Sequence, residues 1–134
     1  MNGRLWALRA AAELADRSDR QLASLLPYFD EVSLPAGRTI ALEGRPCNSY
    51  LIVLQGRLRA WSAEGGCWSL GGGDSLGWQA MWERGLNEAS VMVESDARVL
   101  VMGHAQFRAV KALGRSAAKP SNPEVGLADS RVVA

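Results

Sequence analysis

The side chains that most often do enzyme chemistry are scarce in this sequence. His104 is its single histidine among 134 residues. A metal-dependent β-barrel enzyme of the cupin type needs two or three histidines and a carboxylate around one ion, and a Ser–His or Cys–His nucleophile system would have to use this one imidazole. His104 lies where a strand pattern changes to a helix pattern, which predicts a surface position at a helix start. The sequence therefore predicts a protein that is not an enzyme, with a cupin-like enzyme as the disfavoured alternative.

The two cysteines form no recognisable metal or disulfide motif. Cys47 and Cys67 belong to no CxxC pair and have no zinc-ligand spacing. Their apolar surroundings favour two buried free thiols in a reducing cytoplasm. Residues 1–20 carry charges every few positions, unlike a signal peptide, and no apolar run reaches the roughly eighteen residues of a membrane span. These features predict a cytoplasmic protein with no membrane partner, no metal and no cofactor.

The charge balance disfavours nucleic acid as a partner. The chain carries 15 basic and 14 acidic residues, with a formal net charge of +1. A protein that binds nucleic acid by itself is normally far more basic, because phosphate neutralisation drives its affinity. Arg57, Arg59 and Arg84 are candidates for an anion site. Arg57 and Arg59 alternate with apolar residues along one strand, however, which favours a solvated surface for that pair.

The fold that positions these residues is expected to begin with helices and continue with strands. Apolar residues at helical spacing predict a helix over residues 4–15. Ser18 and Gln21 form the S-x-x-Q pattern of a capping box, which opens a second helix ended by Pro27. From there the apolar period becomes two, and the predicted strands cover residues 32–34, 39–42, 50–54, 57–60, 67–70, 90–94 and 98–102.

Helical segments and tight turns complete the pattern. A helical turn is predicted within residues 75–83, and a helix over 104–113 is expected to end at a Gly114 cap. Turns are predicted at residues 55–56, 65–66 and 95–96. The two-residue loop at 65–66 would place Ala63 opposite Trp68. Residues 50–54 (YLIVL) are apolar throughout, which predicts a strand buried on both faces.

The predicted fold is mainly β, an eight-stranded β-roll or jelly-roll with short flanking helices at both ends. The 14 glycines of the chain support short connections between such strands. The predicted organisation is N-terminal helices over residues 1–27, the roll with its closing helix over 28–114, and a disordered tail over 115–134.

The order and spacing of the glycines and their apolar neighbours form one pattern. It consists of Phe29, Gly37-Arg38-Thr39-Ile40, Gly44, Tyr50-Leu51-Ile52, Gly56, Gly66 and Gly73-Asp74-Ser75-Leu76-Gly77. This pattern resembles the cyclic-nucleotide-binding domain of the catabolite-activator family over residues 20–113. The resemblance implies a β-roll with a regulatory function and a phosphate-binding cassette after Leu76-Gly77. In that family, backbone N–H groups of a short helix hold the cyclic phosphate, a glutamate binds the ribose and an arginine pairs with the phosphate.

The chain departs from the family pattern at both charged positions. Trp78 stands where the family has the glutamate, and Asn87, followed by Glu88, stands where it has the arginine, whereas Ala89 and Ser90 still match. Loss of the arginine removes a contact of roughly 1.5–3 kcal/mol, which is about ten- to a hundredfold in affinity. The indole of Trp78 is expected to occupy the volume that a ribose would fill. The sequence therefore disfavours cyclic AMP and cyclic GMP as ligands.

The candidate ligand-binding residues of this altered cassette are expected to face the interior of the roll. They are Leu76, Gly77, Trp78, Gln79, Asn87, Ala89 and Ser90. Trp78 and Trp82 are interpreted as core residues that fill the pocket, with stacking on a heterocyclic ligand as the alternative. The leading prediction is a non-enzymatic regulatory module that senses a small-molecule ligand. The alternative is a protein-interaction or assembly domain that uses only the fold to bind a protein partner or to form oligomers.

Overall fold

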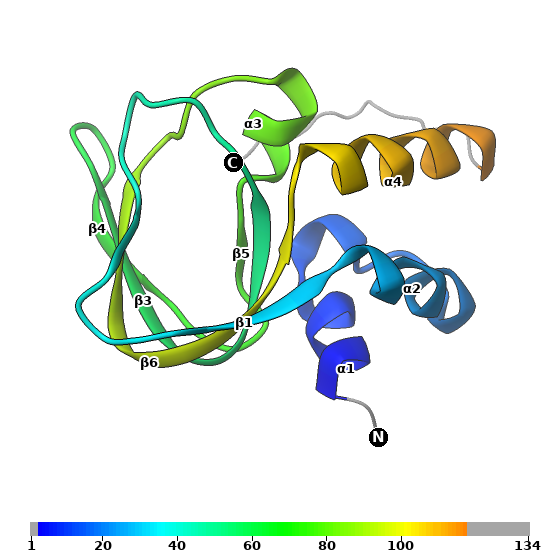
Figure 1. The fold of residues 1–134 in the computed structure, drawn as a ribbon, viewed down its shortest axis with the longest axis horizontal. Coiled ribbons are helices and arrows are strands. Elements are labelled where there is room, and N and C mark those ends of the chain that lie inside the picture. Colours follow the sequence, from blue (N-terminus) through cyan, green and yellow to red (C-terminus); the bar gives the residue numbers. More distant parts are fainter. Residues whose placement is uncertain (1–2, 118–134) are drawn as a thin grey trace.

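Two long antiparallel strands form the centre of the sheet in the computed structural model, which describes residues 3–117. β3 (Tyr50–Ser62) and β6 (Ser90–Met102) pair along their whole length. β1 (Asp30–Leu34) and β2 (Thr39–Ala41) pair with β6, whereas β4 (Gly66–Leu70) and β5 (Ser75–Leu76) pair with β3. The sheet curls into a roll (Figure 1). A mainly β architecture of the predicted kind is therefore confirmed.

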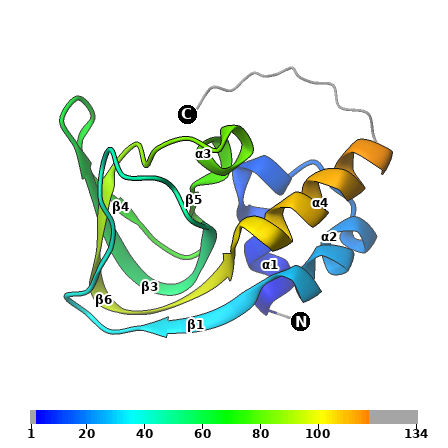
Figure 2. The same ribbon diagram turned by 45° about the horizontal axis from the view of Figure 1, so that its top comes forward.

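The helices precede and follow the strands in sequence and gather beside the roll in space. The chain begins with α1 (Gly3–Ala10), the 3-10 helix η1 (Ala12–Leu14), α2 (Asp19–Leu25) and η2 (Leu26–Tyr28). α3 (Trp78–Glu83) lies between β5 and β6, and α4 (His104–Ala117) follows β6. Figures 1 and 2 show α1, α2 and α4 together on one side of the roll, with α3 next to α4. No helix among the described residues is long and apolar enough to cross a membrane.

The helix boundaries follow the predicted signals at some ends and not at others. The capping box is confirmed, since the hydroxyl of Ser18 accepts from the N–H of Gln21 at 3.1 Å and the amide of Gln21 accepts from the N–H of Ser18 at 2.9 Å. The first helix ends at Ala10 rather than at residue 15. The predicted cap at Gly114 is wrong because α4 continues to Ala117. Of the predicted tail over 115–134, residues 118–134 lie outside the described residues.

The described residues form six strands rather than eight. β3 and β6 each span two of the predicted strand ranges, and β5 lies at residues 75–76, where a helical turn was predicted. Residues 55–56 and 95–96 lie inside these strands, so the predicted turns are bends within them. The pairing register shifts between Val53 and Leu58, and Gly56 adopts a φ of 89°. A β-carbon on Gly56 would lie 2.4 Å from the carbonyl oxygen of Asp96. Only glycine therefore allows the two strands to approach this closely at the bend.

Two apolar cores cover the two faces of the central strands. The inner core consists of strand residues inside the roll: Leu34, Leu51, Val53, Leu58, Ala60, Leu70, Val91, Val93, Ala97 and Val99. The outer core lies between the sheet and the helices and includes Leu8, Leu22, Tyr50, Ile52, Met81, Leu100, Met102 and Phe107. Alternate residues of 50–53 belong to different cores, so the predicted burial on both faces is confirmed there. Beyond the bend, Arg57 and Arg59 are exposed, as predicted.

The hairpin between β3 and β4 has a different register from the predicted one. Ser62 pairs with Gly66 and Ala60 pairs with Trp68, so residues 63–65 form the loop. The hydroxyl of Ser62 accepts a hydrogen bond from the N–H of Gly65 at 2.7 Å, which closes this longer turn. Cys67 is exposed, contrary to the prediction of a buried thiol, because the new register places it on the outer face of the roll.

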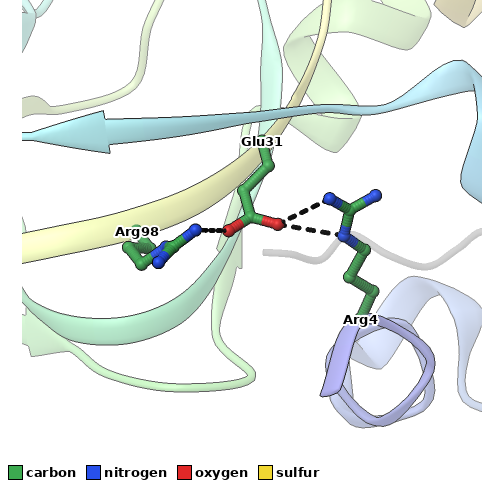
Figure 3. Close-up of polar contacts among 3 residues, drawn as sticks. All are labelled: Arg4, Glu31 and Arg98. Carbon is green, nitrogen blue, oxygen red and sulfur yellow. Dashed lines mark hydrogen bonds and ion pairs between the residues drawn. The ribbon is translucent and has the colours of Figure 1, made fainter. Parts of the chain in front are cut away.

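An ion cluster connects the first helix to the sheet (Figure 3). Glu31 of β1 accepts a hydrogen bond from Nε of Arg4 in α1 at 2.9 Å and forms an ion pair with Arg98 of β6. The hydrogen bond from Arg4 is the largest of the interactions that lower the pKa of Glu31 below its ordinary value of 4.5. The ionised carboxylate therefore stabilises the position of α1 against the roll.

Gly56→Ala is expected to destabilise the fold strongly. The left-handed backbone costs about 1–2 kcal/mol for a residue with a side chain, and the clash with β6 adds about 1–3 kcal/mol. Gly44→Ala is the matched control, since its φ is 83° and a β-carbon there meets nothing within 4 Å. Urea unfolding of both variants measures the difference. Equal losses of stability would contradict the close approach at Gly56.

Glu31→Gln is expected to lower the thermal unfolding midpoint at neutral pH and to have little effect in acid. The lowered pKa means that the ionised carboxylate stabilises the fold above pH 4.5, and that this contribution is lost as the pH falls through the folded-state pKa. Thermal unfolding from neutral to acidic pH measures the gap between wild type and variant. Glu64→Gln, at an exposed position of the β3–β4 loop, is the control. A gap that stays constant at every pH would contradict the prediction.

Candidate functional site

A sharp corner between β5 and α3 sets the direction of the site residues Trp78 and Gln79 that begin the helix. Leu76 pairs with Leu51, so β5 lies against the beginning of β3. Gly77 then adopts a φ of 97°, and a β-carbon on it would lie 2.4 Å from the carbonyl oxygen of Ser49. α3 begins at the next residue, Trp78. The glycine thus turns the chain from the wall of the roll into the helix on its outside.

Leu76 and Ala89 are the two predicted site residues that pack against the inner core. Both are half-buried. They come from segments on either side of α3, and the fold brings them to the same apolar interior. What these two residues offer to a ligand is hydrocarbon surface, with no charge and no hydrogen-bonding group.

Trp78 packs against the outer core, whereas the candidate site residues were expected to face the interior of the roll. The ring of Trp78 meets those of Tyr50 and Phe107 edge-on, with centroid distances of 5.1 and 5.2 Å. It also stacks on Trp82 of the same helix at 5.9 Å. Trp78 packs against the outer core, so the interpretation of this tryptophan as a core residue agrees with its position, but in the other core. The corner at Gly77 is the physical reason.

The polar residues of the predicted site are engaged with the protein itself. Nδ2 of Asn87 donates to the carbonyl of Leu42 at 3.0 Å, and the hydroxyl of Ser90 accepts from the N–H of Glu43 at 3.0 Å. The amide of Gln79 donates to the carboxylate of Glu83 one helical turn later. Asn87 and Ser90 therefore hold the loop after β2, and Gln79 lies along the surface of α3.

A half-buried carboxylate contact near the site was not predicted from the sequence. Glu13 of η1 accepts hydrogen bonds from the hydroxyls of Tyr50 at 2.9 Å and Ser75 at 2.8 Å. Burial, followed by the charge of Glu13, raises the pKa of Tyr50 well above its ordinary value, so the phenol remains a neutral donor. The contact ties the N-terminal helices to the strand that leads into α3. Its one sequence signal is that Glu13 is the single acidic residue in the predicted helix over 4–15.

The other residues whose side chains could take part in chemistry form contacts within the protein. His104 is half-buried at the start of α4, and its Nε2 hydrogen-bonds the carbonyl of Cys47 at 3.0 Å. Burial raises the pKa of the Cys47 thiol. The carboxylate of Asp74 accepts from the N–H of Gly71 at 2.8 Å and closes a turn. Within residues 3–117, no group of three His, Cys, Asp or Glu side chains is placed to hold a metal ion.

Comparison with known proteins agrees with this geometry. The family described as "Cyclic nucleotide-binding domain" matches residues 31–112. Similar solved structures include a putative cyclic nucleotide binding protein from Ruegeria pomeroyi (14% identity, TM-score 0.71, covering 85% of this chain and 51% of that one). The regulatory domain of Toxoplasma gondii PKA with cAMP is similar at 20% identity and a TM-score of 0.70, covering 81% of this chain and 43% of that one.

The Thermus thermophilus Catabolite Activator Protein is 21% identical with a TM-score of 0.64, covering 73% of this chain and 48% of that one. The chain thus spans about half the length of each of these three proteins. A search of curated proteins finds no relative that matches it. The family match covers more than half of the chain and coincides with the roll, α3 and most of α4. The chain therefore belongs to the cyclic nucleotide-binding domain family.

Proposed function

We propose that this chain is a non-enzymatic regulatory module that responds to a ligand other than cyclic AMP or cyclic GMP. The observation that carries the proposal is the state of the two positions where the family has its ribose-binding acid and its phosphate-binding arginine. Trp78 packs against Tyr50 and Phe107 outside the roll, and the amide of Asn87 is hydrogen-bonded to the carbonyl of Leu42. Neither side chain offers a charge to a nucleotide.

The energetics of anion binding support this proposal. A cyclic phosphate inside the roll would lack an arginine at position 87 and would approach Glu88, an exposed acid beside it. The missing charge-assisted contact lowers affinity by about ten- to a hundredfold. The amide of Asn87 would also have to leave its present acceptor before it could turn to a ligand.

The chemistry of the interior indicates what kind of ligand the module would sense. Leu76 and Ala89 add to an inner core that consists of apolar strand residues. An uncharged and largely apolar molecule suits such walls better than a nucleotide, because burying a charge without a partner is unfavourable. The buried thiol of Cys47 is compatible with the reducing cytoplasm, where we place this module.

A role in protein assembly is the second candidate, and the exposed aromatic residues favour it. In the part of the chain that the structure describes, six large apolar side chains are exposed: Trp6, Leu42, Trp61, Trp68, Trp82 and Leu86. Trp61 and Trp68 lie on the two strands of one hairpin. Tryptophan is enriched in the binding surfaces of proteins. The assembly role requires only the fold and no ligand in the roll.

Titration calorimetry with cyclic AMP and cyclic GMP is expected to show no micromolar binding to the wild type. Asn87→Arg restores the missing cation and should raise the affinity for both nucleotides by at least about tenfold. Asn87→Gln, which keeps an uncharged amide, is the matched control and should show no such gain.

Micromolar binding by the wild type would overturn the proposal. A gain with arginine but not with glutamine would support a ligand-accessible roll that lacks only the charge. No gain with either variant, in protein shown to be folded by circular dichroism, would point to a closed interior and favour the assembly role over ligand sensing.

A further inference from the structure

A recess lies outside the roll, between α3 and α4; both ribbon views show α3 near the beginning of α4 (Figures 1 and 2). Its volume is about 280 Å³. Three apolar and four basic residues line it: Met81, Phe107, Ala112, Arg84, His104, Arg108 and Lys111. This recess shares no residue with the predicted ligand site, and it was not anticipated as a site from the sequence, although Arg84 was considered for an anion site.

The spacing of residues along α4 explains why basic groups gather there. His104, Arg108 and Lys111 are four and then three positions apart, which places them on one face of the helix. Phe107 lies on the same side and is buried, as is Met81 of α3, so the recess has an apolar floor. The basic groups therefore surround an apolar floor that is partly shielded from water.

Arg84 joins this rim from the opposite helix. It caps the C-terminus of α3 in the left-handed conformation, with φ 56° and ψ 42°, which glycine adopts far more readily. Glycine does follow, at position 85, so the chain carries an arginine in the left-handed position and the glycine one residue later. The cap fixes the backbone of Arg84 through hydrogen bonds to Ala80 and Met81. Its side chain is thus presented from a defined point.

The cationic groups of the recess differ in how they are held. Lys111 donates to the carbonyl of Trp82 at 2.9 Å and lies 4.6 Å above the centroid of the Trp82 ring. Within residues 3–117, neither Arg84 nor Arg108 forms an ion pair, and both are exposed. Among the described residues, no acidic side chain lines the recess. Two guanidinium groups therefore face a small cavity whose described lining holds no carboxylate.

We propose that this recess binds the phosphate group of a small phosphorylated molecule. A guanidinium presents paired N–H donors that match phosphate oxygens, and Arg84 and Arg108 can approach such a group from opposite helices. The two positive charges together suit a dianion better than a single carboxylate. A cavity of about 280 Å³ is slightly below the usual range of roughly 300–1,000 Å³ for sites of drug-sized ligands. One phosphate with a small substituent fits this space.

The proposed site is independent of the ligand sensed inside the roll. A phosphate held by Arg84 and Arg108 would connect the end of α3 to the middle of α4. α3 starts at the Gly77 corner, directly after the inward-facing Leu76. The site is therefore placed to bias the position of α4 relative to α3 whether or not the roll itself binds a ligand.

The test is calorimetric titration of the full chain with inorganic phosphate and, separately, with glycerol phosphate, at constant ionic strength maintained with sodium chloride. Saturable binding is expected. Arg84→Gln and Arg108→Gln should each weaken it by roughly tenfold. Arg57→Gln is the matched control, because Arg57 is also exposed and lies on β3, outside the recess. Tighter binding of glycerol phosphate would identify an organic phosphate ester as the ligand class, whereas preference for inorganic phosphate would identify the free ion.

Amide chemical-shift changes provide a second measurement that does not depend on mutation. They should concentrate in residues 81–85 and 104–112 during the phosphate titration. Binding that does not saturate, or that weakens equally in the Arg57→Gln control, would overturn the proposal by showing general charge attraction. Shift changes that map to the roll interior would also overturn it, because they would place the phosphate at the family's usual site.

Discussion

The close approach of Gly56 in β3 to Asp96 and Ala97 in β6 is the contact on which the rest of the structure depends. It allows two strands of 13 residues each to stay paired while they bend. On one side of the bend, the strands are covered by helices on one face and by the inner core on the other. On the other side of the bend, one face of the two strands packs in the inner core and the opposite face is exposed to solvent. A sheet that could not bend here would have one face without cover rather than a closed interior.

The same division into inner and outer faces determines what the candidate site can do. Leu76 completes a strand and faces the inner core, whereas Trp78, two residues later, packs in the outer layer. Alternation along a continuous strand would have put both on the same face. The left-handed turn at Gly77 breaks this alternation. A large aromatic residue at the position of the family's acid therefore does not obstruct the roll, and it strengthens the contact with α4 through Phe107.

Features with a local physical cause could be predicted from the sequence. The capping box needs only Ser18 and Gln21, and two-sided burial of residues 50–53 follows from an unbroken apolar run. The glycine spacing was enough to indicate the family and the roll, since each positive φ at a corner restricts the residue type. These predictions are confirmed because the energy that decides them involves residues close together in the chain.

Features decided by long-range contacts could not be predicted from the sequence. A glycine signals a turn or a bulge equally well, so Gly56 was interpreted as a turn, although it lies inside β3. The hairpin loop spans residues 63–65 rather than 65–66, although the hydrogen bond that closes it, from the N–H of Gly65 to the hydroxyl of Ser62, is a local contact. The direction of Trp78 depended on the aromatic rings that surround it. The contact of Glu13 with Tyr50 and Ser75 required three elements to meet, which no local pattern indicates.

The polar side chains of the altered cassette form hydrogen bonds within the protein itself, which explains how the fold persists without the family's charges. An arginine at position 87 would require an anion close by, because an unpaired charge in a partly buried site is unfavourable. Asn87 instead satisfies its amide on the carbonyl of Leu42, and Ser90 satisfies its hydroxyl on the N–H of Glu43. Any ligand that uses these groups must replace their hydrogen bonds, each worth about 1 kcal/mol. The polar groups of the inward wall are thus engaged with one another. The guanidinium groups of Arg84 and Arg108, which form no ion pair within residues 3–117, lie outside the roll, so the proposed phosphate site would move anion recognition from the inside of the roll to α3 and α4.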